Sequence, residues 1–402
     1  MHLLDLIALL ACALLFAKLL GGFANRFGIP SVLIELLTGV LLGNLSFGDF
    51  NLSFSHLENS ELVKGLSELG VLFLLFLVGL ETNLEDMKKV GWDAAAVAFL
   101  GVLAPFVLAF VTIPWIYPSS PFEHTLFIAA ALTATSVGIT ARVLQDCGKL
   151  ASVSGQIILG AAIIDDVLGI IVLTIVSALI TQGHVNGVQF LALLLKIGAF
   201  GIGIFLVRKI IFPQVLNKIK ILEISGTVTI LLLCFCLLSA WAAEKIGLAG
   251  IIGAFALGLA LDRIHFKGYE QSKELPLEKI IKPITDFLSP IFFILMGMGV
   301  KLKSLDDINA IQFSILLIFC ALLGKMVCGL AVSKKSKKRG AHSLLIGFGM
   351  IPRGEVGLIF AAMGKGIGII KDSDYTAVVI MVVVTTLLAP FLISWQAKRV
   401  PS

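Results

Sequence analysis

Long apolar stretches alternate with short polar connections along the whole chain. The stretches are about 16 to 30 residues long, and a helix needs about 20 apolar residues to cross a bilayer. The pattern therefore predicts an all-α polytopic membrane protein with 13 transmembrane helices. We expect these helices at about residues 3–20, 28–47, 66–81, 91–117, 123–144, 152–181, 187–212, 222–243, 247–262, 280–300, 308–332, 341–367 and 373–396.

The basic residues predict how the chain is oriented in the membrane. Of the 31 Lys and Arg residues, 22 fall in loops on one side of the predicted membrane. Cytoplasmic loops carry the excess of Lys and Arg, so the N-terminus is expected outside and the C-terminus in the cytoplasm. Six basic residues lie on the opposite side and three within apolar segments: Lys64, Lys245, Lys301, Lys303, Lys365 and Lys371, and then Lys196, Lys325 and Arg353.

Composition narrows the function classes. Hydrophobic residues make up 58% of the chain and charged residues 14%, as expected for a membrane protein rather than a soluble one. The net charge of +5 comes from residues in short loops, so it does not indicate nucleic-acid binding. The six cysteines form no metal-ligand spacing. We therefore expect no cofactor and no nucleic-acid partner.

Asp165 and Asp166 lie near the middle of the segment 152–181. A carboxylate at membrane depth costs at least ~2.5–3.5 kcal/mol on insertion scales. Two together require a water-filled cavity, a counter-cation or shared protons, which indicates a cation or proton pathway. Consecutive helical residues point about 100° apart. Asp165 can therefore pair with the equally buried Lys325 while Asp166 faces elsewhere, although a static buried ion network is the alternative.

Residues 73–79 and 293–299 resemble each other at an offset of 220 residues. This offset pairs the third predicted helix with the tenth, which run in opposite directions. It predicts an inverted repeat of six plus six helices around a seventh linker helix. The matching pairs are Phe73 and Phe293, Leu75 and Leu295, Gly79 and Gly299, and Asp86 and Asp306.

The same offset pairs the two least regular apolar segments, at residues 131–140 and 347–357. Both combine hydroxyl or charged groups with residues that weaken a helix, and Pro352 removes a backbone donor. Paired interrupted helices expose carbonyls and helix ends that can bind a cation. A simple proline kink is the alternative.

Five motifs together resemble one transporter family over nearly the whole chain: FLLFLVGLE at 73–81, ALTATSVGITARVL at 131–144, the Asp165-Asp166 pair, LGKMVCG with Lys325, and PRGEVGL at 352–358. They resemble the bacterial sodium/proton antiporters of the NapA type, in the monovalent cation:proton antiporter-2 family. The resemblance implies the NhaA/NapA-like fold, with 13 helices and two crossing broken helices. It also implies a homodimer in the bacterial inner membrane, surrounded by lipids.

The resemblance further implies a division into domains. We expect a core, ion-transporting domain at about residues 66–181 and 280–367, together with the flanking helix 373–396. A dimerisation domain is expected at about 3–47 and 222–262, and a linker helix at about 187–212.

The family's functional residues fall on identifiable positions of this chain. The ion-binding carboxylate corresponds to Asp166, and its partner carboxylate, paired with a lysine, to Asp165 and Lys325. The oxygens of the first broken helix correspond to Thr135 and Ser136. The transported Na⁺ is expected on Asp166 and Asp165, and the Asp-Asp pair resembles the electrogenic members. Two charges on the second broken helix are expected to support the site: Glu355 and Arg353.

These features lead us to expect a transporter and not an enzyme. We expect it to exchange Na⁺ or Li⁺ for H⁺ by alternating access, with a role in sodium and pH homeostasis. A K⁺/H⁺ antiporter on the same scaffold is the nearest alternative, and a Na⁺-coupled organic anion symporter is more remote. An intramembrane aspartyl protease is disfavoured because it takes its two aspartates from two helices. A channel is disfavoured because a lysine-paired site suits occlusion better than throughput.

Overall fold

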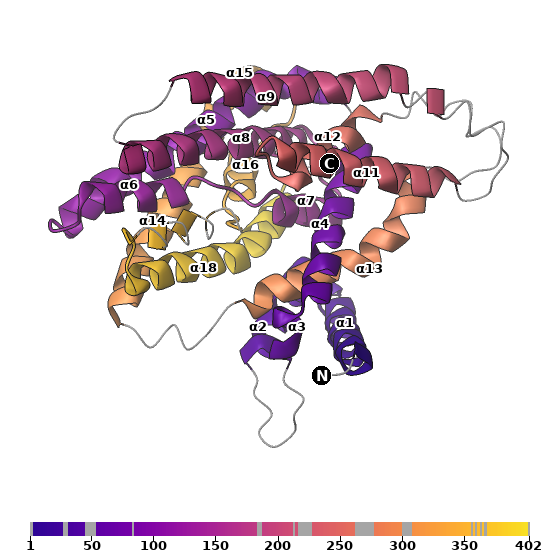
Figure 1. Ribbon diagram of the computed structural model, residues 1–402, viewed down its shortest axis with the longest axis horizontal. Helices are drawn as coiled ribbons and strands as arrows, with labels where there is room; N and C mark the ends of the chain where they lie inside the picture. Colours follow the sequence, from indigo (N-terminus) through magenta and orange to yellow (C-terminus); the bar gives the residue numbers. More distant parts are fainter. Residues whose placement is uncertain are drawn as a thin grey trace.

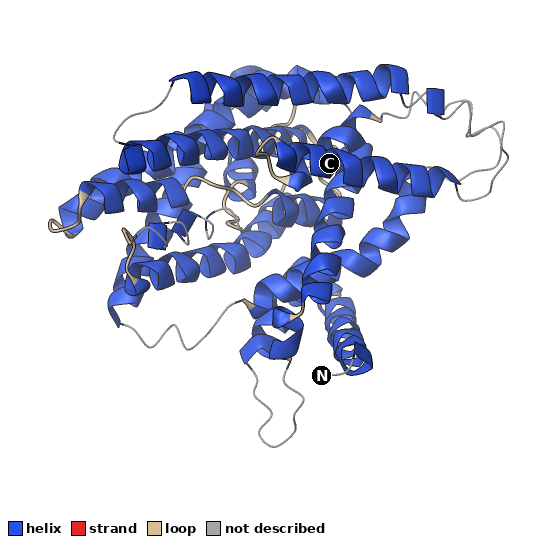
Figure 2. Cartoon of the chain, in the orientation of Figure 1, coloured by secondary structure: helices blue, strands red, loops and turns tan. Residues whose placement is uncertain are grey.

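The computed structural model describes residues 3–26, 31–44, 54–82, 84–182, 187–211, 214–215, 227–261, 277–299, 308–354, 357, 360–361, 364–365 and 368–400. Within these ranges the regular secondary structure is helical and no strand is present (Figure 2). Each apolar segment predicted from the sequence overlaps at least one helix. The segment 123–144 is divided into two helices, and 341–367 begins with a short one.

The helices follow one another along the chain as shown in Figure 1. The first half contains α1 (Leu3–Asn25), α2 (Ser31–Asn44), α3 (Ser55–Asn59), α4 (Glu61–Glu81), α5 (Leu84–Ile116), α6 (Phe122–Ala131), α7 (Val137–Asp146), α8 (Val153–Gln182) and α9 (Gly187–Leu206). The second half contains α11 (Thr227–Lys245), α12 (Gly250–Ala260), α13 (Leu277–Met298), α14 (Ile308–Cys328), α15 (Lys334–Lys338), α16 (Ser343–Gly349) and α18 (Asp372–Ala397).

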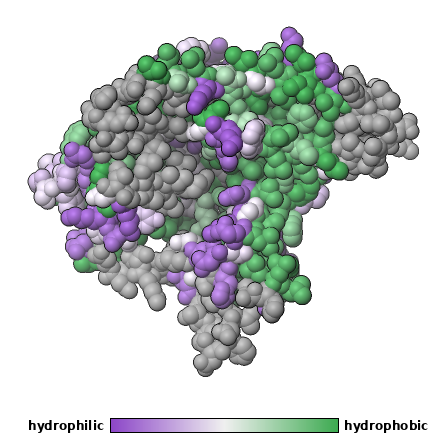
Figure 3. Space-filling model, in the orientation of Figure 1, coloured by the Kyte–Doolittle hydropathy of each residue, from purple (hydrophilic) through white to green (hydrophobic). Residues whose placement is uncertain are grey.

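Six helices in the described part of the chain are long and apolar enough to cross a membrane: α1, α4, α5, α13, α14 and α18. Large apolar side chains also cover much of the outside of the molecule, as the green areas of Figure 3 show on one face. Trp92 is 92% exposed and Trp115 is 82% exposed. An exposed apolar surface of this kind is unfavourable in water and favourable in lipid. The chain is therefore a multi-pass membrane protein.

One group of helices packs backbone against backbone. A Cβ atom on Gly39 of α2 would lie 2.8 Å from the Cα of Gly297 of α13. A Cβ atom on Gly79 of α4 would lie 3.0 Å from the Cα of Gly258 of α12. Small residues permit such close approach between membrane helices. With α4 also packed against α13, these contacts join α2, α4, α12 and α13 into one group, on which α1 and α11 pack.

This packing differs from the domain division expected from the sequence. We expected residues 66–81 and 280–300 in the ion-transporting core, yet the corresponding helices α4 and α13 make their main contacts with each other, α2 and α12. The physical reason is the pairing of glycines across these helices, which the third-to-tenth helix resemblance did not reveal. A second group contains α5, α6, α7, α8, α14, α16 and α18. In it, α5 packs against α8 and α14, and α14 packs against α18 (Figure 1).

The glycine contacts can be tested by adding one methyl group. We expect Gly258→Ala to lower the thermal unfolding midpoint of the purified protein, because overpacking of this kind costs about 1–3 kcal/mol or more. Gly22→Ala on α1 is the matched control, since a Cβ atom there would meet nothing within 4 Å. Equal midpoints for the two variants in a detergent thermal-shift assay would contradict the close packing.

Candidate functional site

A buried ion pair joins α8 to α14. The Nζ atom of Lys325 lies 2.9 Å from Oδ1 of Asp165, and neither side chain is exposed. The structure thus contains the pair that the sequence predicts. Each charge offsets part of the cost of burying the other, because an isolated charge at this depth would be far less stable than the pair.

The packing of α14 against α5 places Lys325 in the interior. A Cβ atom on Gly324 would lie 2.5 Å from the Cα of Pro105, so the two helices approach backbone to backbone at this point. The side chain of the next residue, Lys325, passes Gly101 of α5, where a Cβ atom would lie 3.5 Å from its Nζ. Because Gly101 and Gly324 have no side chains, the lysine has room to reach α8.

Residues 132–136 interrupt the segment predicted as one helix, between α6 and α7. Thr133 donates its hydroxyl to the carbonyl of Ala130 at 2.8 Å, which ends α6. Thr135 donates to the carbonyl of Met350 at 3.3 Å, and the backbone N–H of Ser136 donates to the carbonyl of Pro352 at 2.7 Å. The first interruption is therefore bonded directly to the second.

The second interruption follows α16, whose helical hydrogen bonding ends at Gly349. Residues 351–354 are not helical, as Pro352 predicts. Thr140 of α7 donates to the carbonyl of Gly349 at 2.7 Å, and Thr386 of α18 donates to that of Arg353 at 2.6 Å. Backbone carbonyls freed at membrane depth are thus satisfied by hydroxyls from neighbouring helices.

Arg353 is completely buried at this crossing. Its Nη1 donates to the carbonyl of Ala134, in the first interruption. Its Nε and Nη2 have no hydrogen-bond partner among the described residues. The guanidinium also acts electrostatically on both Asp165 and Lys325. Arg353 therefore adds a buried positive charge at this crossing.

Asp166 is 7% exposed and follows Asp165 on α8. That helix packs against α6, α7 and α16, so it borders both interruptions. Thr135 and Ser136 are also buried. The neighbourhood of α8 thus offers a carboxylate together with hydroxyl and carbonyl oxygens, which are the donors that alkali cations prefer. Glu355, also expected at the site, lies outside the described residues.

The structure adds residues that the sequence analysis did not single out. Thr140 lies in the same ALTATSVGIT motif as Thr135, so its hydroxyl spacing gave a usable signal. Thr386 gave none, because it is one of several hydroxyls in an otherwise apolar helix. The role of Ala134 as an acceptor depends only on its backbone, and no residue type reveals that.

The ion pair can be tested by removing one charge at a time. We expect Asp165→Asn to lower the thermal unfolding midpoint strongly, because leaving one partner of a buried pair alone costs about 3–5 kcal/mol. The double variant Asp165→Asn with Lys325→Gln removes both charges and should recover much of the loss. A single variant as stable as wild type, with the double variant less stable, would contradict the pair.

Comparison with known proteins identifies the family. Residues 11–399 match the family model described as sodium/hydrogen exchanger, transmembrane. The chain is 35% identical to the high-affinity Na⁺/H⁺ antiporter NhaS3 of Synechocystis sp., over 93% of this chain and 86% of that protein. It is 33% identical to the Na⁺/H⁺-K⁺ antiporter GerN of Bacillus cereus, over 96% of this chain and 95% of that one.

Among solved structures, the fold is similar to that of the sodium proton antiporter MjNhaP1 from Methanocaldococcus jannaschii at pH 8. The TM-score is 0.67, over 99% of this chain and 98% of that chain, at 20% sequence identity. At this identity the likeness concerns the fold alone. The match to the family model, by contrast, covers nearly the whole chain, and the chain therefore belongs to the sodium/hydrogen exchanger family.

Proposed function

We propose that this chain is a secondary active transporter that exchanges Na⁺, or Li⁺, for H⁺ across the membrane by alternating access. The observation that carries the proposal is the buried Asp165–Lys325 pair, next to Asp166 on a helix that borders two interrupted helices. The names of the relatives NhaS3 and GerN support the same exchange. The transported ions are the only ions the mechanism requires, and it needs no cofactor.

Competition at Asp166 couples the two ions in this proposal. The ionised carboxylate binds Na⁺ with help from oxygens of Thr135, Ser136 and nearby backbone carbonyls. A proton on the carboxylate removes its charge and therefore releases Na⁺. Because the two cannot occupy the same carboxylate together, each crossing of the membrane carries either Na⁺ in one direction or H⁺ in the other.

In this proposal, Asp165 and Lys325 account for the second proton that is exchanged. Na⁺ bound near Asp166 also attracts the neighbouring carboxylate of Asp165. This attraction weakens the ion pair between Asp165 and Lys325. If Lys325 then loses its proton, exchange of two protons for one Na⁺ is electrogenic. Groups this close titrate as a set, so the proton counts belong to Asp165, Asp166 and Lys325 together. Arg353 stays bonded to the first interruption and keeps the local charge balanced.

We further propose the finer architecture that the resemblance implies. It has 13 membrane-spanning helices, an inverted six-plus-six repeat and a NapA-type homodimer in the bacterial inner membrane, with the N-terminus outside. The contact between α4 and α13, which carry the two resembling sequences, supports the repeat. The contact between the interruptions near Thr135 and Pro352 supports crossing broken helices.

The moving unit that we propose follows the packing. It contains α5 to α8, α14, α16 and α18, with Asp165, Asp166 and both interruptions. The stationary unit contains α1, α2, α4 and α11 to α13, and α9 links the two. The glycine contacts of Gly39 with Gly297 and Gly79 with Gly258 support a rigid stationary unit.

A K⁺/H⁺ antiporter is the second candidate, because GerN is named for potassium as well as sodium. Ion choice depends on the size of the site and on the positions of its carbonyls, which the residue types at 135, 136 and 166 do not fix. One assay that presents each ion separately can distinguish the two candidates.

Reconstituted protein tests the exchange directly. We expect added Na⁺ or Li⁺ to dissipate a pH gradient imposed across proteoliposomes, and Asp166→Asn to abolish this flux because it removes the shared carboxylate. Asp372→Asn is the matched control, since that carboxylate is 86% exposed and lies at the start of α18. Its flux should equal wild type.

Three results would change the proposal. Dissipation by K⁺ alone would establish the potassium candidate. Wild-type flux in Asp166→Asn would remove Asp166 from the mechanism. Absence of flux with Na⁺, Li⁺ and K⁺, from folded wild-type protein, would contradict cation/proton exchange.

A further inference from the structure

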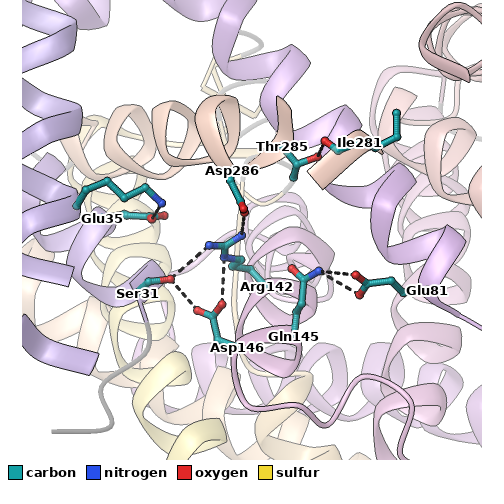
Figure 4. A network of polar contacts seen from close by, with 10 residues as sticks. Ser31, Glu35, Glu81, Arg142, Gln145, Asp146, Ile281, Thr285 and Asp286 are labelled. Atoms are coloured by element: carbon teal, nitrogen blue, oxygen red, sulfur yellow. Dashed lines mark hydrogen bonds and ion pairs between the residues drawn. The ribbon is translucent and has the colours of Figure 1, made fainter. Parts of the chain in front are cut away.

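A second polar network, separate from the Asp165–Lys325 pair, lies where α7 meets α2, α4 and α13 (Figure 4). It borders a cavity of about 530 Å³ between α1, α2, α7 and α13. Acidic and basic side chains line this cavity in equal number: Lys18, Arg142 and Lys282 with Glu35, Asp146 and Asp286.

Arg142 is the hub of the network. Its Nε lies 3.3 Å from Oδ1 of Asp146 on the same helix, and its Nη1 lies 3.7 Å from Oδ1 of Asp286 on α13. Its Nη2 donates to Ser31 of α2 at 3.5 Å, and the Ser31 hydroxyl donates to Asp146 at 2.8 Å. One turn of α7 therefore contacts two helices of the other packing group.

Gln145 adds a third connection from the same turn. Its Nε2 donates to both carboxylate oxygens of Glu81 on α4, at 3.2 and 3.0 Å (Figure 4). The contacts of Arg142, Gln145 and Asp146 with α2, α4 and α13 all cross the boundary between the two packing groups. Asp146 and Asp286 are partly exposed, and such polar contacts are individually weak enough to break during a conformational change.

A second cavity, lined mainly by apolar side chains, lies along the same boundary. This cavity of about 290 Å³ lies between α2 and α13 on one side and α18 on the other, and it reaches Gly354 and Thr386 at the second interruption. Val40 of α2 lines it, nine residues beyond Ser31, and Gly297 of α13 lines it, 11 residues beyond Asp286. Its nearest lining residues are closer to the polar network: Leu36 lies five residues beyond Ser31 and Phe292 six residues beyond Asp286, or about 8 to 9 Å along the helices at 1.5 Å per residue.

We propose that the contacts of Arg142, Gln145 and Asp146 with Ser31, Glu81 and Asp286 form a latch that joins the two packing groups at one end of their boundary. This is the end that the basic residues assign to the cytoplasm. The inference rests on the proposed function, because alternating access requires the latch to open in each cycle.

A buried reporter on α2 can detect the opening. Thr38 lies seven residues, or two turns, beyond Ser31 on the same face of α2 and is 2% exposed. With the six native cysteines replaced by alanine, Thr38→Cys is labelled from the cytoplasmic side of inside-out vesicles with a membrane-impermeant methanethiosulfonate. The labelling rate measures how often this end of the boundary is open.

Two substitutions at one position should change this rate in opposite directions. Gln145→Glu places a carboxylate against Glu81 and should raise the labelling rate about three- to tenfold, through like-charge repulsion at a partly exposed position. Gln145→Lys forms an ion pair there and should lower the rate. The double variant Gln145→Glu with Glu81→Lys restores the attraction and should return the rate toward that of the reporter alone.

An unchanged rate in Gln145→Glu, or a double variant as fast as Gln145→Glu, would overturn the latch. If Gln145→Glu does not fold, an unchanged rate in Gln145→Lys would overturn it equally. Labelling is measured without transport, so the two proposals fail separately. Rates that respond as expected in a protein without cation-driven proton flux would retain the latch and remove the exchange function.

Discussion

Asp165 and Lys325 hold opposite charges 2.9 Å apart in the buried interior, where an isolated charge would be costly. Other features of the site follow from this constraint. The pair requires α14 to approach α5 closely at Gly324 and requires α8 to carry its carboxylate at mid-membrane. Asp166, the next residue, adds a second buried carboxylate beside the pair. We propose that a transported cation or a proton neutralises it.

The two interruptions solve a related problem with backbone groups. A broken helix in a membrane exposes carbonyls that need donors, and here Thr135, Thr140 and Thr386 supply them from neighbouring segments. Arg353 adds a positive charge at the same crossing. The crossing is therefore held in part by directional hydrogen bonds. Close glycine contacts occur in both groups: they join α2, α4, α12 and α13, and they bring α14 against α5 at Gly324.

Charge and hydropathy in the sequence were sufficient to predict the apolar segments and the Asp165–Lys325 pair, because the cost of an unpaired charge in lipid leaves few arrangements. The interruption at Pro352 was predictable for a similar reason. The grouping of α4 and α13 was not predictable from the sequence. The close contacts depend on glycines that lack a side chain, and such residues show their effect only once it is known which helices face each other: Gly39, Gly79, Gly258 and Gly297. Contacts between α7 and α4, such as Gln145 with Glu81, also depend on tertiary placement, so neither residue type marks them in advance.

The most direct test of this account is the number of protons released when Na⁺ is added to the purified protein in weakly buffered detergent solution. If Na⁺ and H⁺ compete for Asp166, Na⁺ should release protons from the wild-type protein, with a saturating dependence on Na⁺ concentration. The same addition should release none from Asp166→Asn, and choline should release none from either protein. Saturable heat of Na⁺ binding to the wild-type protein, without proton release across the pH range in which it transports, would contradict the competition on which the mechanism depends.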